Sequence, residues 1–299
     1  MATRVGQSAR EQDGGVARAS TAETDLGILF RGAVEVDFEE GRSALKRCAA
    51  QLSNLIRGIE NPGAKPPRLK WTNAEVATHL IQTFRYDLAN VEGTSTPYPV
   101  EGGNVLASGA RASEVRIKEE TERDPRRLAD MFDEAVKDFL DRTADRDPLQ
   151  PVVFAEGHAM TLANLNATIL GEVLVHGFDI AKGDGKSWKM DPEASRLAVY
   201  ATTATLPLGV DQEAAKDIDV RLNVRLRGGR AFQMHLFNGT GTTEPCSKAD
   251  ATISADAAAF MLVGFGRIGP VVPVLTGKII AWGRRPLLAA RMNKYLLPI

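Results

Sequence analysis

The chain has 299 residues, 43% of them hydrophobic and 25% charged, which is the composition of a globular protein with enough apolar material for a core. Its 37 basic and 38 acidic residues give a net charge of −1, so no positive field is available to attract nucleic acid or an anionic membrane. The length favours two domains. The two cysteines, Cys48 and Cys246, lie far apart without ligand-type spacing, which indicates a reducing cytoplasm rather than a disulfide framework.

The first 25 residues lack the apolar core of a signal peptide and predict a flexible leader over 1–25. The most apolar later stretch, residues 260–280, is interrupted by glycines, prolines, Arg267 and Lys278, so no membrane-spanning helix is expected. These features predict a cytoplasmic protein with neither a membrane nor nucleic acid among its partners.

Four amphipathic helices are predicted within the first 185 residues. Apolar side chains recur at helical spacing over about 33–60, from 72 to 90, from the Asp124-Pro125 pair onward, and from Thr161 to about Ala181. The second begins with "TNAE", a capping box. The stretch 91–112, rich in glycine, proline, serine and threonine, predicts a long loop. A four-helix bundle over 26–188 is the simplest fold for this pattern.

The pattern of apolar residues changes from helical spacing to strand-like alternation from about residue 190. "DVRLNVRLRGGRAFQMHLF" alternates apolar and polar side chains on both sides of a Gly-Gly pair, which predicts a β-hairpin. "ADATISADAAAFMLVG" predicts a short strand that leads into a helix capped by Ser254 or Asp256, and "PLLAARMNKYLL" predicts a last helix. Residues 189–299 therefore predict a small α+β domain. "GFGRIG" satisfies a dinucleotide fingerprint, but a helix precedes it and prolines follow it, so we reject that reading.

Two polar residues stand out on the fourth helix. Glu172 and His176 are four residues apart, just over one turn, and share the apolar stripe of Leu165 and Ile169. A buried charge needs a partner. The pair is either a Glu–His hydrogen bond without metal or part of a metal centre, and Asp179 beside it would orient a ligand.

A metal centre needs at least a third ligand. The chain has four histidines. His79, midway along the second helix, could reach the fourth helix across a bundle, but it flanks the Val76–Leu80 stripe, so the pattern alone leaves it undecided. His158 and His235 lack ligand partners at suitable spacing and are expected to be structural or surface residues.

"LKWTNAEVATHL", followed about ninety residues later by "LGEVLVHGFDIAKG", resembles the mycothiol-dependent maleylpyruvate isomerase family. That family has a Trp before the second helix, a His within it and an E-x-x-x-H-x-x-D run on the fourth, which Trp71, His79, Glu172, His176 and Asp179 match. The resemblance implies a DinB-like metal-binding four-helix bundle followed by a small α+β sterol-carrier-like domain. It also implies that His79, Glu172 and His176 are the metal ligands and that Asp179 lies behind them.

Two imidazoles and one carboxylate suit zinc, while nickel or iron would also accept them. Such an ion stabilises a coordinated thiol as thiolate. Since neither cysteine looks placed for this role, the thiol must come from outside. The resemblance implies that mycothiol is the cosubstrate and that it adds to a small electrophile in an isomerisation or an S-transfer. We expect the protein to be a monomer or a homodimer.

An anionic substrate would also need donors. Arg221 and Arg225 on the polar face of the hairpin, and Arg85 on the second helix, are candidates because guanidinium groups suit carboxylates. The alternative is that the hairpin face is simply solvated.

A non-catalytic function is the alternative to the enzyme. In it the C-terminal part binds a lipid or other small molecule in an apolar cavity lined by "AAAFMLVGFG", and the bundle metal is structural.

Overall fold

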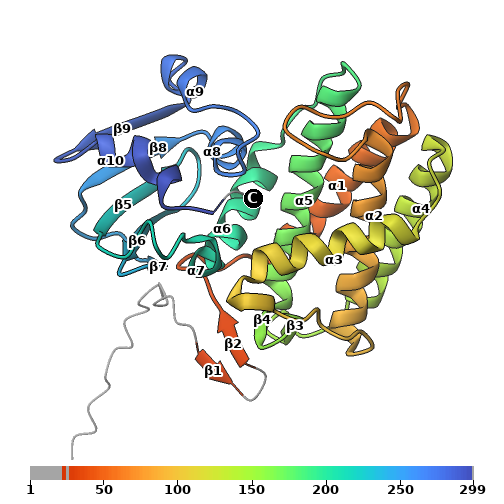
Figure 1. Cartoon of the computed structure of the whole chain (residues 1–299), viewed down its shortest axis with the longest axis horizontal. Coiled ribbons are helices and arrows are strands. Elements are labelled where there is room, and N and C mark those ends of the chain that lie inside the picture. The colour runs from red at the N-terminus through yellow and green to blue at the C-terminus, as the bar shows by residue number, and fades with distance from the viewer. Residues whose placement is uncertain (1–21, 25–26, 298–299) are drawn as a thin grey trace, which may run out of the picture.

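The computed structural model describes residues 22–24 and 27–297. A helical bundle and a mixed sheet with its own helices lie next to each other (Figure 1). Most of the leader predicted over 1–25 lies outside the described residues. Ala22–Thr24 within it forms strand β1, which pairs antiparallel with β2 (Gly27–Phe30).

The bundle consists of α1 (Phe38–Arg57), α2 (Asn73–Glu92), α4 (Pro125–Arg142) and α5 (Leu162–Gly183), and the prediction of four helices is confirmed. Each starts at a side-chain cap, and Thr72 and Glu75 form the predicted capping box on α2. The phenyl ring of Phe84 on α2 packs edge-on against two rings of α4 in the bundle core. Buried apolar side chains on facing helices therefore hold the bundle together.

The prediction of a loop over 91–112 is wrong for the second half of that segment. It contains a 3-10 turn (Glu101–Gly103) and the start of helix α3 (Val105–Glu119), which Asn104 caps. The apolar periodicity of this segment is weak, because only Val105, Ser108 and Ile117 of the helix are buried. α3 packs against α2 and lies across the bundle in Figure 1.

A small sheet in the order β1-β2-β4-β3 closes one end of the bundle. β3 (Pro151–Ala155) and β4 (His158–Thr161) form a hairpin that leads directly into α5. β4 also pairs in parallel with β2, so the hairpin ties the first described strands to the bundle.

The second part carries a five-stranded sheet in the order β7-β6-β5-β8-β9. The predicted hairpin is confirmed as β5 and β6, which pair antiparallel, whereas β5 and β8 are parallel. The sequence reading did not identify the helix α6. In chain order the elements are α6 (Pro192–Ala204), α7 (Leu206–Gly209), β5 (Asp219–Leu226), β6 (Ala231–Phe237), β7 (Thr240–Glu244), β8 (Ala251–Ala255), α8 (Ala257–Gly264), α9 (Val271–Leu275), β9 (Ile279–Gly283), α10 (Leu287–Arg291) and a 3-10 turn (Met292–Lys294).

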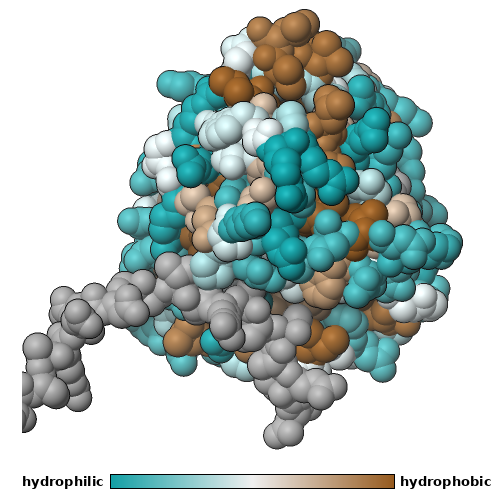
Figure 2. Space-filling view, turned by 90° about the vertical axis from the view of Figure 1, so that its left-hand side faces the viewer, coloured by the Kyte–Doolittle hydropathy of each residue, from teal (hydrophilic) through white to brown (hydrophobic). Residues whose placement is uncertain are grey.

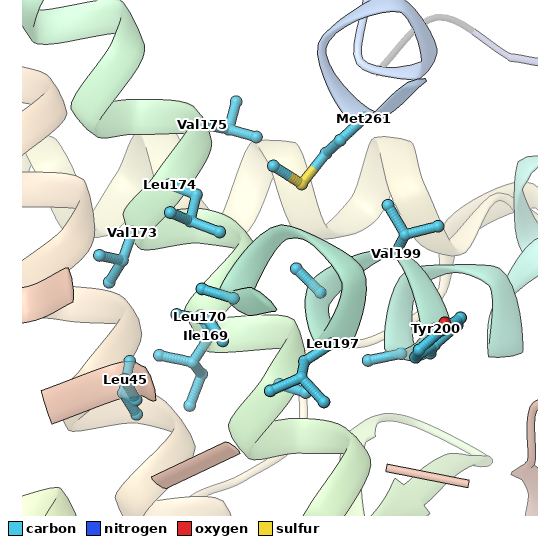
Figure 3. Close-up of a cluster of buried hydrophobic side chains, with 14 of the residues drawn as sticks. Leu45, Ile169, Leu170, Val173, Leu174, Val175, Leu197, Val199, Tyr200 and Met261 are labelled. Carbon is cyan, nitrogen blue, oxygen red and sulfur yellow. The ribbon is translucent and has the colours of Figure 1, made fainter. Parts of the chain in front are cut away.

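The two parts share one apolar core through α5. Its side chains face α1 on one side and α6 on the other, so almost the whole helix is buried. Figure 3 shows Leu45 of α1, Leu174 of α5 and Leu197 of α6 in one continuous cluster that reaches Met261 of α8. A helix that is apolar all round is expected at such a central position. Within the described ranges, no helix is long and apolar enough to cross a membrane.

Candidate metal centre

α2 and α5 bring His79, Glu172 and His176 together. One ligand atom from each residue lies within 4.8 Å of the other two. Nε2 of His79 and Nε2 of His176 are each 3.2 Å from the same oxygen, Oε2 of Glu172. Three donor atoms from two helices thus converge on one point, as a shared cation requires.

Helix geometry explains the convergence. Glu172 and His176 lie one turn apart on the same face of α5. The ring of His79 crosses that of His176 edge-on, with ring centres 5.0 Å apart. Trp71, which immediately precedes the Thr72 cap of α2, packs against both imidazoles, at 4.9 Å and 6.4 Å between ring centres. The capping box fixes the start of α2. Because Trp71 directly precedes the cap, its indole ring is thereby held over the two histidines.

The three side chains differ in their access to solvent. The imidazoles of His79 and His176 are 11% and 7% exposed, whereas the carboxylate side chain of Glu172 is 29% exposed. Solvent and small molecules can therefore approach the group from the side of Glu172.

Asp179 lies where the sequence predicted it, behind His176. Its Oδ2 is 2.9 Å from Nδ1 of His176, and the Asp179 side chain is 2% exposed. A carboxylate that accepts a hydrogen bond from Nδ1–H favours the tautomer in which the lone pair of Nε2 is available on the side of Glu172. The pair therefore fixes both the orientation and the tautomer that a metal ligand needs.

Arg267 is the residue at this site that sequence reasoning missed. Its Nε donates to both carboxylate oxygens of Asp179, each at 3.1 Å, and its side chain is 9% exposed. It belongs to the turn after α8, inside the rejected "GFGRIG" stretch, where Nη1 also donates to the carbonyl of Phe265. Only the packing of the second part on the bundle reveals this contact, because no local spacing relates the two residues.

Burial and charge act against each other in the triad. Burial by itself would raise the pKa of Glu172, but hydrogen bonds with His176 and His79 lower it well below its usual value. Burial would likewise lower the pKa of His176, but Asp179 and Glu172 raise it to about 9. The pKa of His79 is lowered, mainly by burial. Without a metal, the group is thus held as a carboxylate with one charged and one neutral imidazole.

The three arginines predicted as substrate-binding residues do not reach this group. Arg85 is exposed and lies 4.0 Å from Glu120 of the segment after α3. On β5, Leu222 pairs with Met234 and is buried, so Arg221 and Arg225, which alternate with the buried residues, point to the opposite face of the sheet. The alternation of apolar and polar residues along β5, which predicted the strand, thus also places these arginines on the face of the sheet that points away from the bundle.

The remaining two histidines lie outside this group. His158 stacks on the ring of Phe30 with ring centres 5.9 Å apart. His235 contacts Asp219 and Glu244 on the sheet surface. Across residues 22–24 and 27–297, His79, Glu172 and His176 form the only group of at least three His, Cys, Asp or Glu residues with this geometry.

The comparisons with known proteins agree with this architecture. The family model described as the mycothiol maleylpyruvate isomerase N-terminal domain matches residues 45–181. The crystal structure of the mycothiol-dependent maleylpyruvate isomerase is 13% identical and covers 82% of this chain and 93% of its own, with a TM-score of 0.49. A mutant of that isomerase, with one histidine replaced by alanine, is 14% identical over the same shares, with a TM-score of 0.50.

No curated protein matches the chain. The structural likeness concerns the fold: a helical bundle followed by a mixed sheet region, as the sequence predicted. The likeness of the second part to sterol-carrier-like domains stays a prediction. Residues 45–181, just under half of the chain, thus match the mycothiol maleylpyruvate isomerase N-terminal domain family.

Proposed function

We propose that the protein is a metal-dependent enzyme that activates a small external thiol, mycothiol in this family, for addition to an electrophile. The convergence of His79, Glu172 and His176 supports the proposal most directly. Two imidazole nitrogens and one carboxylate oxygen fit zinc, with nickel and iron as further possibilities. These residues would hold the cation, and Asp179 and Arg267 would keep His176 in place.

A bound divalent cation would supply an electropositive centre that favours the thiolate form of a coordinated thiol. The chain's own residues orient and shelter that centre. Trp71 covers the two imidazoles, and Glu172 leaves one side accessible to solvent. The order of events after thiolate addition, isomerisation or retention of sulfur, depends on the electrophile.

An external thiol follows from the positions of the cysteines. Cys48 is 2% exposed in the core of the bundle, and burial raises its pKa to about 12. Cys246 is exposed beyond β7, and burial likewise raises its pKa. Neither cysteine belongs to the His79–Glu172–His176 group. A thiolate at the candidate centre must therefore come from another molecule.

Metal analysis tests the first part of the proposal. The purified protein, grown with ample zinc, is expected to contain about one equivalent of metal, and H79A and H176A to have lost it. H158A is the matched control, since His158 lies on β4 away from the group and should leave the metal content unchanged. A native protein as metal-poor as H79A and H176A would refute a metal centre.

Product analysis tests the second part. The metal-loaded protein is incubated with mycothiol and a panel of small electrophiles, and products are identified by mass. Metal-dependent formation of an adduct or a cis–trans isomer is expected with at least one electrophile. Products that form equally fast with the H176A variant would contradict catalysis at this centre.

An apolar cavity in the second part of the chain supports a second candidate function, the binding of a small molecule. A cavity of about 500 Å³ lies between α6, α8 and the C-terminal segment, and none of the described residues that line it is charged. Its walls include Val199, Met234, Phe260, Phe265 and Leu296. Such a cavity supports binding of an uncharged apolar molecule, which is the function of the non-catalytic alternative. Mass spectrometry of ligands retained after gentle purification tests it: a co-purifying lipid favours this function, and a thiol conjugate favours the enzyme.

A further inference from the structure

Arg116 on α3 is a cation beside the candidate centre, and it has no ion-pair partner among the described residues. Its guanidinium lies 4.4 Å from the ring centre of Tyr86 on α2. Across residues 22–24 and 27–297, no carboxylate lies within 4.0 Å of its nitrogens, whereas Arg85 and Arg111 each have one. Its Nη2 donates to the hydroxyl of Ser113, at 3.3 Å.

The Nε of Arg116 is buried, and no described residue accepts a hydrogen bond from it. A buried N–H without an acceptor costs free energy, and the charge on the guanidinium increases this cost. Nε and Nη2 lie on one edge of the guanidinium and together match the two oxygens of a carboxylate. One planar anion, such as a carboxylate, would therefore supply the hydrogen-bond acceptors that this edge of the guanidinium lacks.

α3 places this edge close to the metal-binding group. Glu114, two residues before Arg116, pairs with Lys70, next to the Trp71 that covers both histidines. Tyr86 follows His79 by seven residues, two turns along the same face of α2, or roughly 10 Å of helix axis. Arg116 is near enough for its charge to lower the pKa of His79, where burial is the largest effect.

Asp87 forms no ion pair with Arg116 within the described part of the chain. The Asp87 residue is 8% exposed, and burial together with repulsion from Glu172 raises its pKa to about 7, against a smaller opposing effect of Arg116. Among the described residues, its side chain accepts one hydrogen bond, from the amide of Asn90 at 3.5 Å. The Arg116 guanidinium therefore has no carboxylate of the described chain in ion-pair contact.

We propose that Arg116 binds a carboxylate of the electrophile and so selects unsaturated acids over their neutral esters and amides. The inference rests on the proposed function, because it takes the reacting carbon to lie at the centre formed by His79, Glu172 and His176. The roughly 10 Å along α2 between His79 and Tyr86 is the distance that the two side chains and a small ligand would span together. Tyr86, under the guanidinium, holds the arginine in this orientation.

Binding of unreactive probes tests this role. Succinate and its neutral counterpart succinamide are titrated by calorimetry into the full-length protein, both zinc-loaded and chelator-treated. The wild type is expected to bind succinate at least tenfold more tightly than succinamide. R116M is expected to lose that preference, and R116K, which keeps the charge without the planar edge, to retain part of it. R111M is the matched control: Arg111 lies on the same helix but pairs with Glu101, so succinate binding should stay within twofold.

Several results would overturn the inference. Equal binding of succinate and succinamide by the wild type would do so, as would unchanged succinate binding by a folded R116M or R116K. A third arm compares N-acetylcysteine with its amide. If Arg116 discriminates only between these two thiols, the carboxylate belongs to the thiol and not to the electrophile.

The experiments can refute the proposed metal centre and the proposed anion site at Arg116 independently of each other. A protein that binds no zinc but prefers succinate through Arg116 would refute the metal centre and leave the anion site. A protein that binds zinc but shows no dependence on Arg116 would refute the anion site alone. Melting temperatures of the variants, expected to match that of R111M, separate loss of a ligand contact from loss of the fold.

Discussion

The Nε of Arg267 donates to both carboxylate oxygens of Asp179, and Asp179 in turn contacts Nδ1 of His176. This chain of contacts connects the turn after α8 in the second part to a candidate metal ligand in the bundle. The C-terminal part thus does more than cover the bundle: it helps to fix the orientation of one imidazole.

The variant D179N is expected to bind zinc ten- to a hundredfold more weakly than the wild type, because Asn cannot match a carboxylate as acceptor for the Nδ1 proton. Competition with a chromogenic chelator measures the affinity. E193Q on α6, whose side chain is 54% exposed, is the control and should bind zinc like the wild type. A D179N affinity within twofold of the control would show that Asp179 does not support the ligand.

The variant G177A is expected to destabilise the protein, because a Cβ at this position would lie 2.4 Å from a ring carbon of Trp188. Overpacking of this kind costs about 1–3 kcal/mol in the free energy of unfolding. Urea unfolding measures the change. The control lies on the same helix: at Gly171 a Cβ would meet Ala198 at 3.5 Å, an ordinary contact, so G171A should be neutral or slightly stabilising. Equal stability of the two variants would argue against tight packing of Trp188.

The stability of the chelator-treated protein is expected to depend on pH through Asp87. Burial is the main reason that its pKa rises from 3.8 to about 7. A carboxyl with a raised pKa favours folding most when protonated, so its contribution is complete below its ordinary pKa and is lost as the pH rises through about 7. The variant D87N imitates the protonated form and should be more stable than the wild type by about 2–4 kcal/mol near pH 8.

Urea unfolding of wild type and D87N near pH 8 and near pH 4 checks this expectation. The difference should nearly vanish at the lower pH, where the wild-type carboxyl is protonated in the folded protein. D133N, at an exposed position on α4, controls for the general effect of removing one negative charge. A D87N effect that is the same at both pH values would exclude titration of Asp87 as its cause.

Only one of the two cysteines is expected to react with a thiol reagent in the native protein. Cys246 is exposed, whereas Cys48 is 2% exposed and its pKa is raised to about 12, chiefly by burial. Colorimetric titration should count one fast thiol in the native state and two in urea. The variant C246S should show none before unfolding. A fast second thiol in the native state would mean that the bundle core opens near α1.

The four bundle helices and the β5–β6 hairpin could be predicted from local patterns, because their caps and apolar periodicities are strong. α3 could not, since it buries few side chains and its sequence is typical of a loop. α6 lies between the bundle and the hairpin, and its residues were not recognised as a separate helix because they follow α5 after a short connection.

For the site, spacing alone placed Glu172 and His176 on one face of α5. The pairing of His79 with them depended on a resemblance, because its position beside the apolar stripe did not decide which way the ring points. The arginines were beyond local reasoning. Arg267 contacts Asp179, and Arg116 stacks on Tyr86, only through the packing of separate segments, whereas the predicted Arg221 and Arg225 face the other side of a sheet.

The position of α5 has a consequence for how the molecule comes apart. One side of this helix is covered by α1 and the other by α6, so separating the bundle from the sheet would expose a long apolar surface to water. The two parts should therefore melt in a single cooperative transition, and neither half should remain dispersed when it is expressed without the other.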